Sequence, residues 1–196
     1  MPTGVAIRDV REQLFAAADR VLLRDGPSAL TSRAVTDEAG CAKGVLHRHF
    51  DDFDAFLAEF VLDRVDRMDP QVAALRESAG TGSVVDNLAE ALTAVFSSVA
   101  VAIVPLLIFR DQLRARLRET WPAGVPVLTE AVGMVAGYLT AERDLGRIAS
   151  DAAVDGLAPT LIGAAHLLFA DRTGVAPDAA AIREMVSTVI AGVVRE

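Results

Sequence analysis

The stretch TSRAVTDEAGCAKGVLHRHF, residues 31–50, decides the fold. Thr31 can cap a short helix over residues 32–39, because its side-chain oxygen can accept a hydrogen bond from a free N–H of the first turn. Gly40 can end that helix in the left-handed conformation. A second short helix, over residues 42–50, follows after this tight turn. The pattern predicts a helix-turn-helix, in which one helix crosses the DNA backbone and the other enters the major groove.

Several side chains of this stretch are suited to contact nucleic acid. Lys43 is the only lysine of the chain, and with the Gly44 backbone it stands where a phosphate or a base edge could be met. Arg48 can form two hydrogen bonds with guanine, and His47 is a further candidate for base readout. A lone surface cation is more often only solvated, but the ordered motif favours contact. The predicted DNA-contacting residues are Thr31, Ser32, Arg33, Ala42, Lys43, Gly44, His47, Arg48 and His49.

In order and spacing, residues 31–50 resemble the tetracycline-repressor (TetR) family of transcriptional regulators, and the resemblance extends over about residues 8–57. The family pattern has a Thr cap, an Ala-Gly turn and a small residue followed by Lys-Gly. Leu, an aromatic residue, two polar residues and Phe then follow. The resemblance implies an all-α homodimer whose N-terminal domain binds DNA and whose C-terminal domain binds a small-molecule effector.

The chain departs from the family pattern at four places. Thr36 stands where Ala is usual, which would loosen the helix packing, and Cys41 stands where Val is usual. His47 replaces a usual Tyr, which would make DNA affinity sensitive to pH. Residues 51–54 read Asp-Asp-Phe-Asp, so Phe53 takes the place of a common phosphate-binding lysine. Because carboxylates repel phosphates, we expect a modest DNA affinity or an unusual operator.

The formal net charge of −8 at first argues against a DNA-binding protein. The charge is uneven, since residues 1–50 hold seven Lys and Arg against six Asp and Glu, and the rest carries −9. A near-neutral head can still bind DNA if its cations gather on one face. Cys41 is the only cysteine, which fits a reducing cytoplasm. No apolar signal segment follows Met1, so we expect no secretion.

Apolar residues spaced by three and four predict an all-α fold of about nine helices. Besides the two helices above, they are expected over about residues 6–24, 52–69, 83–104, 105–119, 127–143, 151–171 and 178–194. Pro70 is expected to end the fourth helix before a linker at 71–82, Ser83 to cap the fifth, and Pro105 to lie in the first turn of the sixth. The uncharged run 91–109 approaches a membrane-spanning length. Interrupting Ser and Pro residues favour a buried helix that lines a cavity.

This pattern predicts two domains. Residues 1–50 would bind DNA, a helix over about residues 51–69 would connect, and residues 70–196 would bind a ligand and dimerise. The last two helices are expected to pair across a two-fold axis into a four-helix bundle, unless their apolar stripe only covers its own domain.

The C-terminal half shows no trusted Ser-His-Asp order, no glycine-rich phosphate loop and no Cys/His metal spacing. We therefore expect no enzyme activity, no metal and no cofactor. Instead, aromatic and apolar residues would line a pocket for a mainly apolar small molecule, although each of them is more often plain core. The predicted lining residues are Phe96, Ile103, Phe109, Trp121, Met134, Tyr138, His166 and Phe169.

Two further features of this half have two interpretations each. Four arginines cluster in one predicted helix, and they are more often a solvated face than a site for an anionic ligand. They are Arg110, Arg114, Arg116 and Arg118. Gly133 and Gly137 lie one helical turn apart, which permits close helix packing or leaves room for a ligand.

Together these features predict a cytoplasmic, homodimeric and ligand-responsive transcriptional regulator, acting as a repressor that a mainly apolar molecule releases. Its expected partners are a double-stranded DNA operator, a small-molecule effector and a second copy of the chain, with no membrane. The alternative is a ligand-binding or protein-interaction module whose specific DNA binding is weak or lost, which the carboxylates of residues 51–54 motivate.

Overall fold

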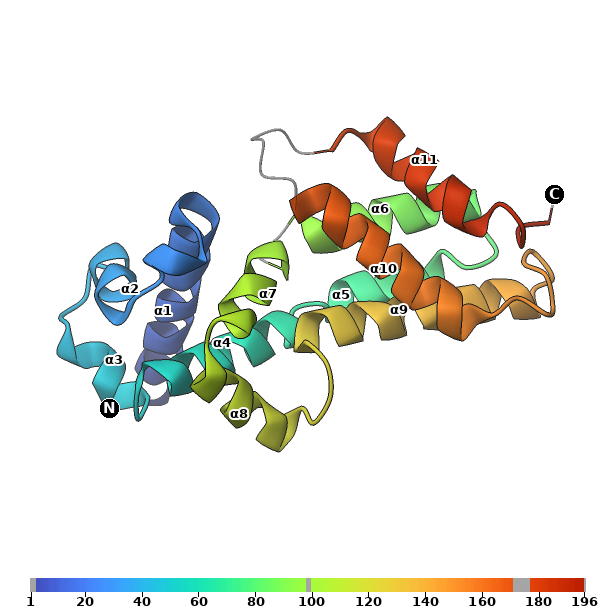
Figure 1. Cartoon of the computed structure of the whole chain (residues 1–196). Coiled ribbons are helices and arrows are strands. Elements are labelled where there is room, and N and C mark those ends of the chain that lie inside the picture. Colours follow the sequence, from blue (N-terminus) through green and yellow to red (C-terminus); the bar gives the residue numbers. More distant parts are fainter. Residues whose placement is uncertain (1–2, 98–99, 171–176, 196) are drawn as a thin grey trace. The chain divides into compact units, whose positions relative to one another are not determined.

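Eleven α-helices and one short 3₁₀ helix make up the described part of the chain (Figure 1). The computed structural model describes residues 3–97, 100–170 and 177–195, with residues 3–9 described by their backbone only. Within these ranges the only β pairing is an isolated bridge between Ile148 and Val194, so the predicted all-α class is confirmed. The helices are α1 (Thr3–Asp25), η1 (Pro27–Ala29), α2 (Ser32–Glu38), α3 (Gly44–His49), α4 (Phe53–Asp66), α5 (Asp69–Glu77), α6 (Val84–Phe96), α7 (Ala100–Ile108), α8 (Asp111–Thr120), α9 (Pro126–Asp144), α10 (Val154–Ala170) and α11 (Ala179–Ile190).

The chain divides into two compact units. Residues 1–63 and 102–124 form the first unit, and residues 64–101 and 125–196 form the second. This division differs from the expected domain boundaries in two respects. The segment 102–124, which includes α8, groups with the N-terminal helices, and so do residues 51–63 of the expected connecting helix. The assignment of DNA binding and ligand binding to separate domains remains a prediction.

Proline accounts for most of the differences between the expected and observed helices. The expected linker at 71–82 is wrong over its first part, because α5 begins at Asp69 and Pro70 lies in its first turn, where a missing N–H costs no intrahelical hydrogen bond. Pro105 lies inside α7 and not in a first turn. The expected helix over 105–119 is divided, since α7 ends at Ile108 and α8 starts at Asp111.

Most of the other helix starts lie within about three residues of expectation, but two helices end early: the last one, expected to residue 194, ends at Ile190. Ser83 caps α6 and accepts a hydrogen bond from the backbone N–H of Asp86 at 3.3 Å. The helix expected over residues 83–104 corresponds to α6 at its start and ends earlier than expected, at Phe96. Ser98, which was expected within that helix, and Asp171, the expected end of the eighth, lie outside the described residues.

A cluster of phenylalanines forms the core of the first unit. Phe56 of α4 lies at its centre, with ring centroids 5.6 Å from Phe15, 5.1 Å from Phe50 and 6.3 Å from Phe60. Phe53 stacks on Phe56 at 5.6 Å. These five rings come from α1, α4 and the end of α3, so they hold α3 against the long N-terminal helix α1.

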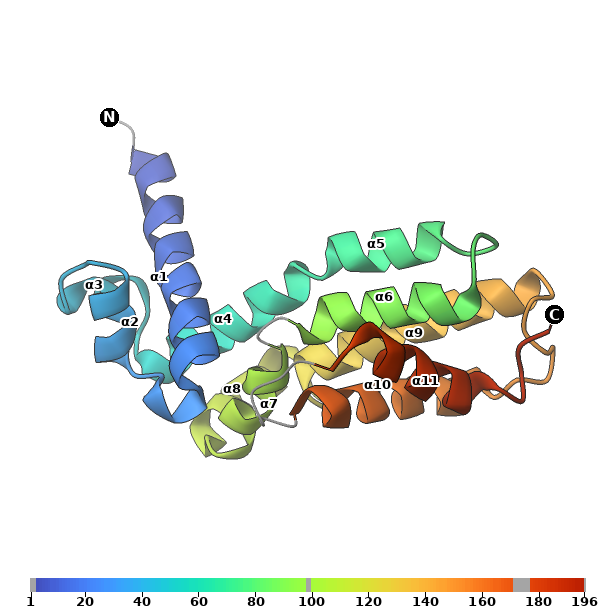
Figure 2. The same ribbon diagram turned by 90° about the horizontal axis from the view of Figure 1, so that it is seen from above.

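The second unit is a bundle in which α5, α6, α9, α10 and α11 run alongside one another (Figure 2). Buried leucine, valine and isoleucine side chains of these helices fill its interior. Its chain end is tied to the α9–α10 turn, because Ala149 donates a backbone hydrogen bond to Val193 at 2.7 Å and Arg195 donates one to Arg147 at 2.9 Å.

A buried polar network lies inside the second unit. The Glu142 carboxylate is fully buried; one oxygen accepts a hydrogen bond from the Gly80 backbone N–H at 3.2 Å, and the other lies 3.3 Å from Nε of Arg147. Asn87 donates a hydrogen bond to the Tyr138 hydroxyl at 3.0 Å. Burial raises the pKa of Tyr138 well above its usual range, so this hydroxyl stays neutral.

No single helix in the described ranges is long and apolar enough to cross a membrane; taken together as a bent pair, α6 and α7 would satisfy that test of length and composition.

Candidate nucleic-acid interface

Local hydrogen bonds define both ends of α2. The Thr31 hydroxyl accepts a hydrogen bond from the Ala34 N–H at 3.1 Å, which is the cap expected from the sequence. At the other end Gly40 adopts φ +67°, and the N–H of Cys41 donates to the Thr36 carbonyl at 3.0 Å while the N–H of Gly40 donates to Asp37 at 3.2 Å. This pair of bonds is the Schellman motif, which turns the chain sharply into α3.

Thr36 does not leave an unsatisfied hydroxyl in the core. The side chain is fully buried, but its hydroxyl donates to the backbone carbonyls of Ser32 and Arg33, at 3.0 and 3.1 Å. Burial of the larger side chain is therefore accommodated by hydrogen bonds inside α2.

Contacts on one side of α3 leave its other side exposed. Leu46 is fully buried, and Phe50 at the helix end enters the phenylalanine cluster. Arg11 of α1 donates a hydrogen bond to the His49 carbonyl at 3.1 Å, and its guanidinium lies 4.3 Å from the centre of the Phe50 ring. Arg11 also forms an ion pair with Glu59 of α4. A six-residue helix has little stability of its own, so these contacts hold it in place.

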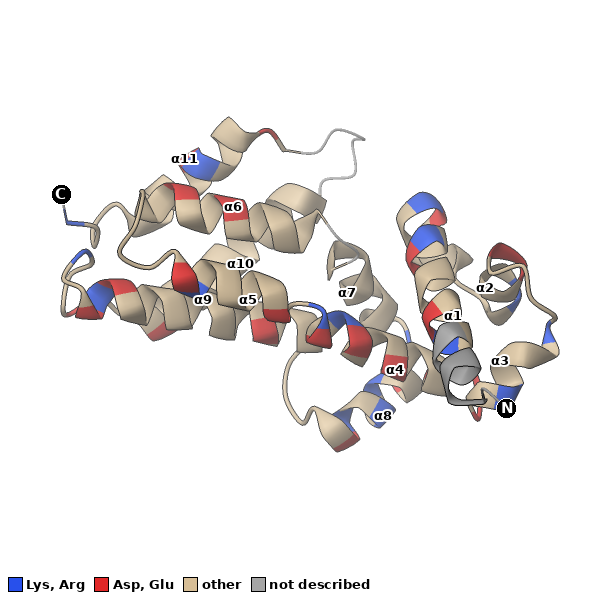
Figure 3. Ribbon diagram, turned by 180° about the vertical axis from the view of Figure 1, so that it is seen from behind, with Lys and Arg blue, Asp and Glu red and all other residues tan. Residues whose placement is uncertain are grey.

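The polar side chains of α3 and of the turn before it face solvent. Lys43, His47 and Arg48 are exposed and His49 is half-buried. Among the described residues, Lys43 and Arg48 form no ion pair, so both charges are available to a ligand. Figure 3 shows basic positions on α3 and also on α8.

The predicted DNA-contacting residues around α2 differ in their exposure to solvent. Thr31 and Arg33 are exposed and Ser32 is half-buried. Arg33 lies 3.4 Å from the carboxylate of Asp37 one turn later, in a solvent-exposed pair that costs little to break. The small residues Ala42 and Gly44 are exposed beside Lys43, so the backbone there is accessible.

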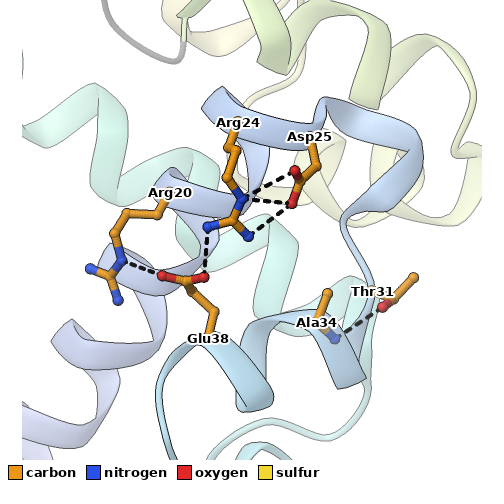
Figure 4. A network of polar contacts seen from close by, with 6 residues as sticks. All are labelled: Arg20, Arg24, Asp25, Thr31, Ala34 and Glu38. Carbon is orange, nitrogen blue, oxygen red and sulfur yellow. Dashed lines mark hydrogen bonds and ion pairs between the residues drawn. The ribbon is translucent and has the colours of Figure 1, made fainter.

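A network of charged side chains joins α1 to α2 (Figure 4). Arg20 and Arg24 of α1 each donate to a different oxygen of Glu38, at 2.7 and 2.9 Å, and Arg24 also pairs with Asp25. The hydrogen bond from Arg20 is the main cause that holds the pKa of Glu38 below its ordinary value of 4.5. The hydrogen bond to Asp25 is the largest cause that raises the pKa of Arg24. Both arginines therefore stabilise the α1–α2 packing.

Glu38→Gln is expected to lower the stability of the first unit at pH 7 and to have no effect in acid. The folded-state pKa of Glu38 is depressed, so its stabilisation is present above about pH 4.5 and is lost as the pH falls through the lower folded value. Urea midpoints of wild type and variant should differ at pH 7 and converge near pH 3. Glu12→Gln, an exposed α1 residue without an ion pair among the described residues, is the control; equal midpoints for all three proteins at pH 7 would refute the effect.

The acidic start of α4 is paired with arginines of the α8 region. Asp52 caps α4 by accepting a hydrogen bond from the Ala55 N–H at 2.7 Å, and its other oxygen forms an ion pair with Arg116. Asp54 pairs with Nη1 of Arg110 at 3.1 Å. The sequence indicated both the acidic stretch and the arginine cluster but not that they meet, because 56 and 64 residues separate the partners.

The predicted ligand-lining residues fall into separate groups. Phe96, His166 and Phe169 of the second unit lie together, with centroid distances of 6.1 Å from Phe96 to His166 and 5.8 Å from Phe96 to Phe169. Ile103 and Trp121 belong to the first unit, as does Phe109, which is 83% exposed. Burial lowers the pKa of His166, and its Nε2 has no hydrogen-bond partner in the described part of the chain.

The other two predicted lining residues, Met134 and Tyr138, border a groove of about 440 Å³ on the second unit. The groove lies between α5 and α9, where the exposed Gly133 and Gly137 leave open space: a Cβ on either would meet no atom within 4 Å. The glycines therefore widen a surface groove, and close helix packing is not their role in this structure. The Tyr138 hydroxyl is already bonded to Asn87.

The last two helices expose apolar and small side chains. On α10, Gly156, Gly163 and Leu167 are exposed, Leu167 by 74%. On α11, Ile182, Val186 and Ile190 are buried within the unit, whereas other positions of the helix are open. Part of the apolar stripe on α11 therefore covers its own unit, and α10 offers the uncovered face.

Comparisons with known proteins agree with this geometry. Residues 14–60 match the model of the family described as bacterial regulatory proteins of the tetR family. A comparison with curated proteins finds no match. Solved structures share the fold: a TetR transcription regulator from Haloarcula marismortui ATCC 43049 has a TM-score of 0.72 at 16% identity, with coverage of 96% of this chain and 100% of that chain.

Two further structures are similar over nearly the whole chain. The fatty acid degradation regulator FadR from Bacillus halodurans has a TM-score of 0.68 at 15% identity, with coverage of 93% of this chain and 95% of that chain. The transcriptional regulator FadR from Bacillus subtilis, in complex with stearoyl-CoA, has a TM-score of 0.65 at 16% identity, with coverage of 92% and 98%. With residues 14–60 matched by the family model and the fold shared with these regulators, the chain carries a tetR-family helix-turn-helix on the fold of these regulators.

Proposed function

We propose that the chain is a transcriptional regulator that binds double-stranded DNA through α3. The observation that carries this proposal is the exposed charge of Lys43 and Arg48, which form no ion pair among the described residues, at the start of and on a short helix that the Schellman turn and the phenylalanine cluster hold in place. Lys43 and the Thr31 region would contact phosphates, and His47 and Arg48 would contact base edges. Cations at these positions provide binding energy, and the base contacts provide specificity.

For the second unit we propose binding of a mainly apolar small molecule that releases the protein from DNA, which makes it a repressor. The α5–α9 groove with Met134 and the ring cluster of Phe96, His166 and Phe169 support this role. The Bacillus subtilis relative was solved with stearoyl-CoA, which carries a long apolar chain. Release requires that the effector bind the DNA-competent and the released conformations with different affinity.

The working form that we propose is a homodimer through α10 and α11. The exposed face of α10 includes Gly156, Gly163 and Leu167. This face supports packing against a second copy of the chain, because small residues let two helices approach closely. Two copies would place two α3 helices on half-sites about one DNA turn apart. The DNA complex should then contain two chains, which sedimentation of the complex can count.

Lys43→Ala is expected to weaken binding to all bound sequences and to flatten the salt dependence. One lost phosphate contact lowers the slope of log affinity against log salt by about one for each chain bound. Binding sites are first selected from random DNA fragments, and affinities are then measured by mobility shift over a range of salt. Arg76→Ala, which removes an exposed cation of α5, should leave the slope unchanged.

An unchanged slope for Lys43→Ala would contradict the phosphate contact. If selection at low salt returns no preferred sequence for the wild-type protein, the alternative gains support: a ligand-binding or protein-interaction module that has lost specific DNA binding.

A further inference from the structure

We propose that Arg110 and Arg116, which lie outside the helix-turn-helix, mask the acidic start of α4 and so determine how tightly the first unit binds DNA. The proposal rests on the DNA-binding function proposed above. It makes two arginines of the α8 region part of the DNA-binding machinery, although neither has to touch DNA.

The carboxylates in question lie close to the recognition helix. Asp52 follows His49, the last residue of α3, by three residues, so their Cα atoms are at most about 11 Å apart. That separation is about one Debye length at 0.1 M salt, which means that salt does not fully screen Asp52 from a phosphate bound at α3. An uncompensated carboxylate there would oppose DNA binding.

The structure pairs two of the three carboxylates with guanidinium groups. Arg116 of α8 forms an ion pair with Asp52, and each side chain is about half-exposed. Arg110, the residue before α8, lies 3.1 Å from Asp54, and that pair is more buried, with 31% and 19% of the side chains exposed. Only Asp51 has no ion pair in the described ranges. Two of the three negative charges are therefore compensated within the first unit.

Arg110 also fixes the position of the acidic segment. Its Nη2 donates to the Leu30 carbonyl at 3.3 Å, just before the Thr31 cap of α2, and its guanidinium lies 5.3 Å from the centre of the Phe53 ring. One side chain thus joins the start of α2, the start of α4 and the start of α8. The cation also lies over the phenylalanine that stands where the family pattern has a lysine.

The pairing is specific to these two members of the arginine cluster. Arg114 pairs with Asp111 of its own helix. Arg118 is exposed and forms no ion pair in the described part of the chain, although it carries the same charge on the same helix as Arg116. If α8 acted as a general basic face, all four arginines would contribute equally. Masking of α4 depends on Arg110 and Arg116 alone.

Charge-neutral substitutions separate masking from direct contact. Arg116→Gln uncovers Asp52 and should weaken DNA binding about 3- to 10-fold at low salt. Asp52→Asn removes the carboxylate and keeps the helix cap, because Asn caps helices as well as Asp. In the double variant Arg116→Gln/Asp52→Asn, affinity should return to within about 2-fold of wild type. Arg118→Gln, the matched control, should stay within about 2-fold throughout.

The proteins are compared by mobility shift with one selected DNA fragment, and their circular dichroism spectra are recorded to confirm the fold. The proposal is overturned if Arg116→Gln and Arg118→Gln weaken binding equally. It is also overturned if the double variant stays as weak as Arg116→Gln, because Arg116 would then contact DNA itself. If the wild-type protein binds no fragment, the proposed function fails and this proposal fails with it.

Discussion

Phe56→Ala should lower the free energy of unfolding of the first unit by about 3–5 kcal/mol. The Phe56 side chain is fully buried, and four aromatic rings surround it with centroids 5.1 to 6.3 Å away. Truncation removes the packing of the whole ring and leaves a cavity among side chains from three helices. The loss is a large part of the stability of a typical domain, so DNA binding should fail as well.

Urea unfolding followed by tryptophan fluorescence measures the loss of stability of the first unit. Trp121 is the only tryptophan of the chain and belongs to the first unit, so its signal reports that unit. Phe109→Ala is the control, because Phe109 is 83% exposed and its truncation should change stability by less than about 0.5 kcal/mol. A loss for Phe56→Ala as small as that of the control would show that the ring cluster is not the stabilising core.

Arg147→Gln should destabilise the second unit by about 2–4 kcal/mol. Nε of Arg147 lies 3.3 Å from Glu142 Oε2, and this oxygen has no hydrogen-bond partner among the described residues. Without the guanidinium, a fully buried carboxylate would lose its compensating charge. The lower end of the range reflects the 26% exposure of the Arg147 side chain, which lets water replace part of the interaction.

The loss should be read from the urea dependence of circular dichroism at helix wavelengths. The second substitution Glu142→Gln in the Arg147→Gln background should recover part of the stability, because it removes the unpaired charge. Arg143→Gln, in the last turn of α9 and four residues before Arg147, is expected to be almost neutral, because Arg143 has no ion pair among the described residues. If the double variant is less stable than Arg147→Gln, the carboxylate does not depend on Arg147 for its compensation.

The helix-turn-helix could be predicted because its determinants are local in sequence. A Thr cap bonds three residues ahead, and Gly40 bonds back across one turn, so residues 31–41 contain the information that shapes them. The same locality made Ser83 predictable as a helix cap. Where the hydrogen bonds span only a few positions, a residue and its near neighbours in the sequence are enough to predict the local structure.

Contacts between distant segments could not be predicted in the same way. The pairs Arg110–Asp54 and Arg116–Asp52 join helices that only the folded chain brings together, and hydrophobic periodicity does not report them. Phe109 was expected in a ligand pocket on the strength of its aromatic character, but it is exposed, because periodicity cannot tell which face of a short helix is covered. Pro70 was misread because proline can begin a helix as well as end one.

The dependence of α3 on the phenylalanine cluster has a consequence for genetics. A helix of six residues cannot persist once Leu46 and Phe50 lose their neighbours, so the proposed DNA-binding surface and the aromatic core act as one cooperative element. For the repressor proposed above, a screen for constitutive expression of the target genes would therefore recover core and surface alleles with the same phenotype. Cellular protein level separates them, since degradation removes unstable chains and spares those that have only lost a phosphate or base contact.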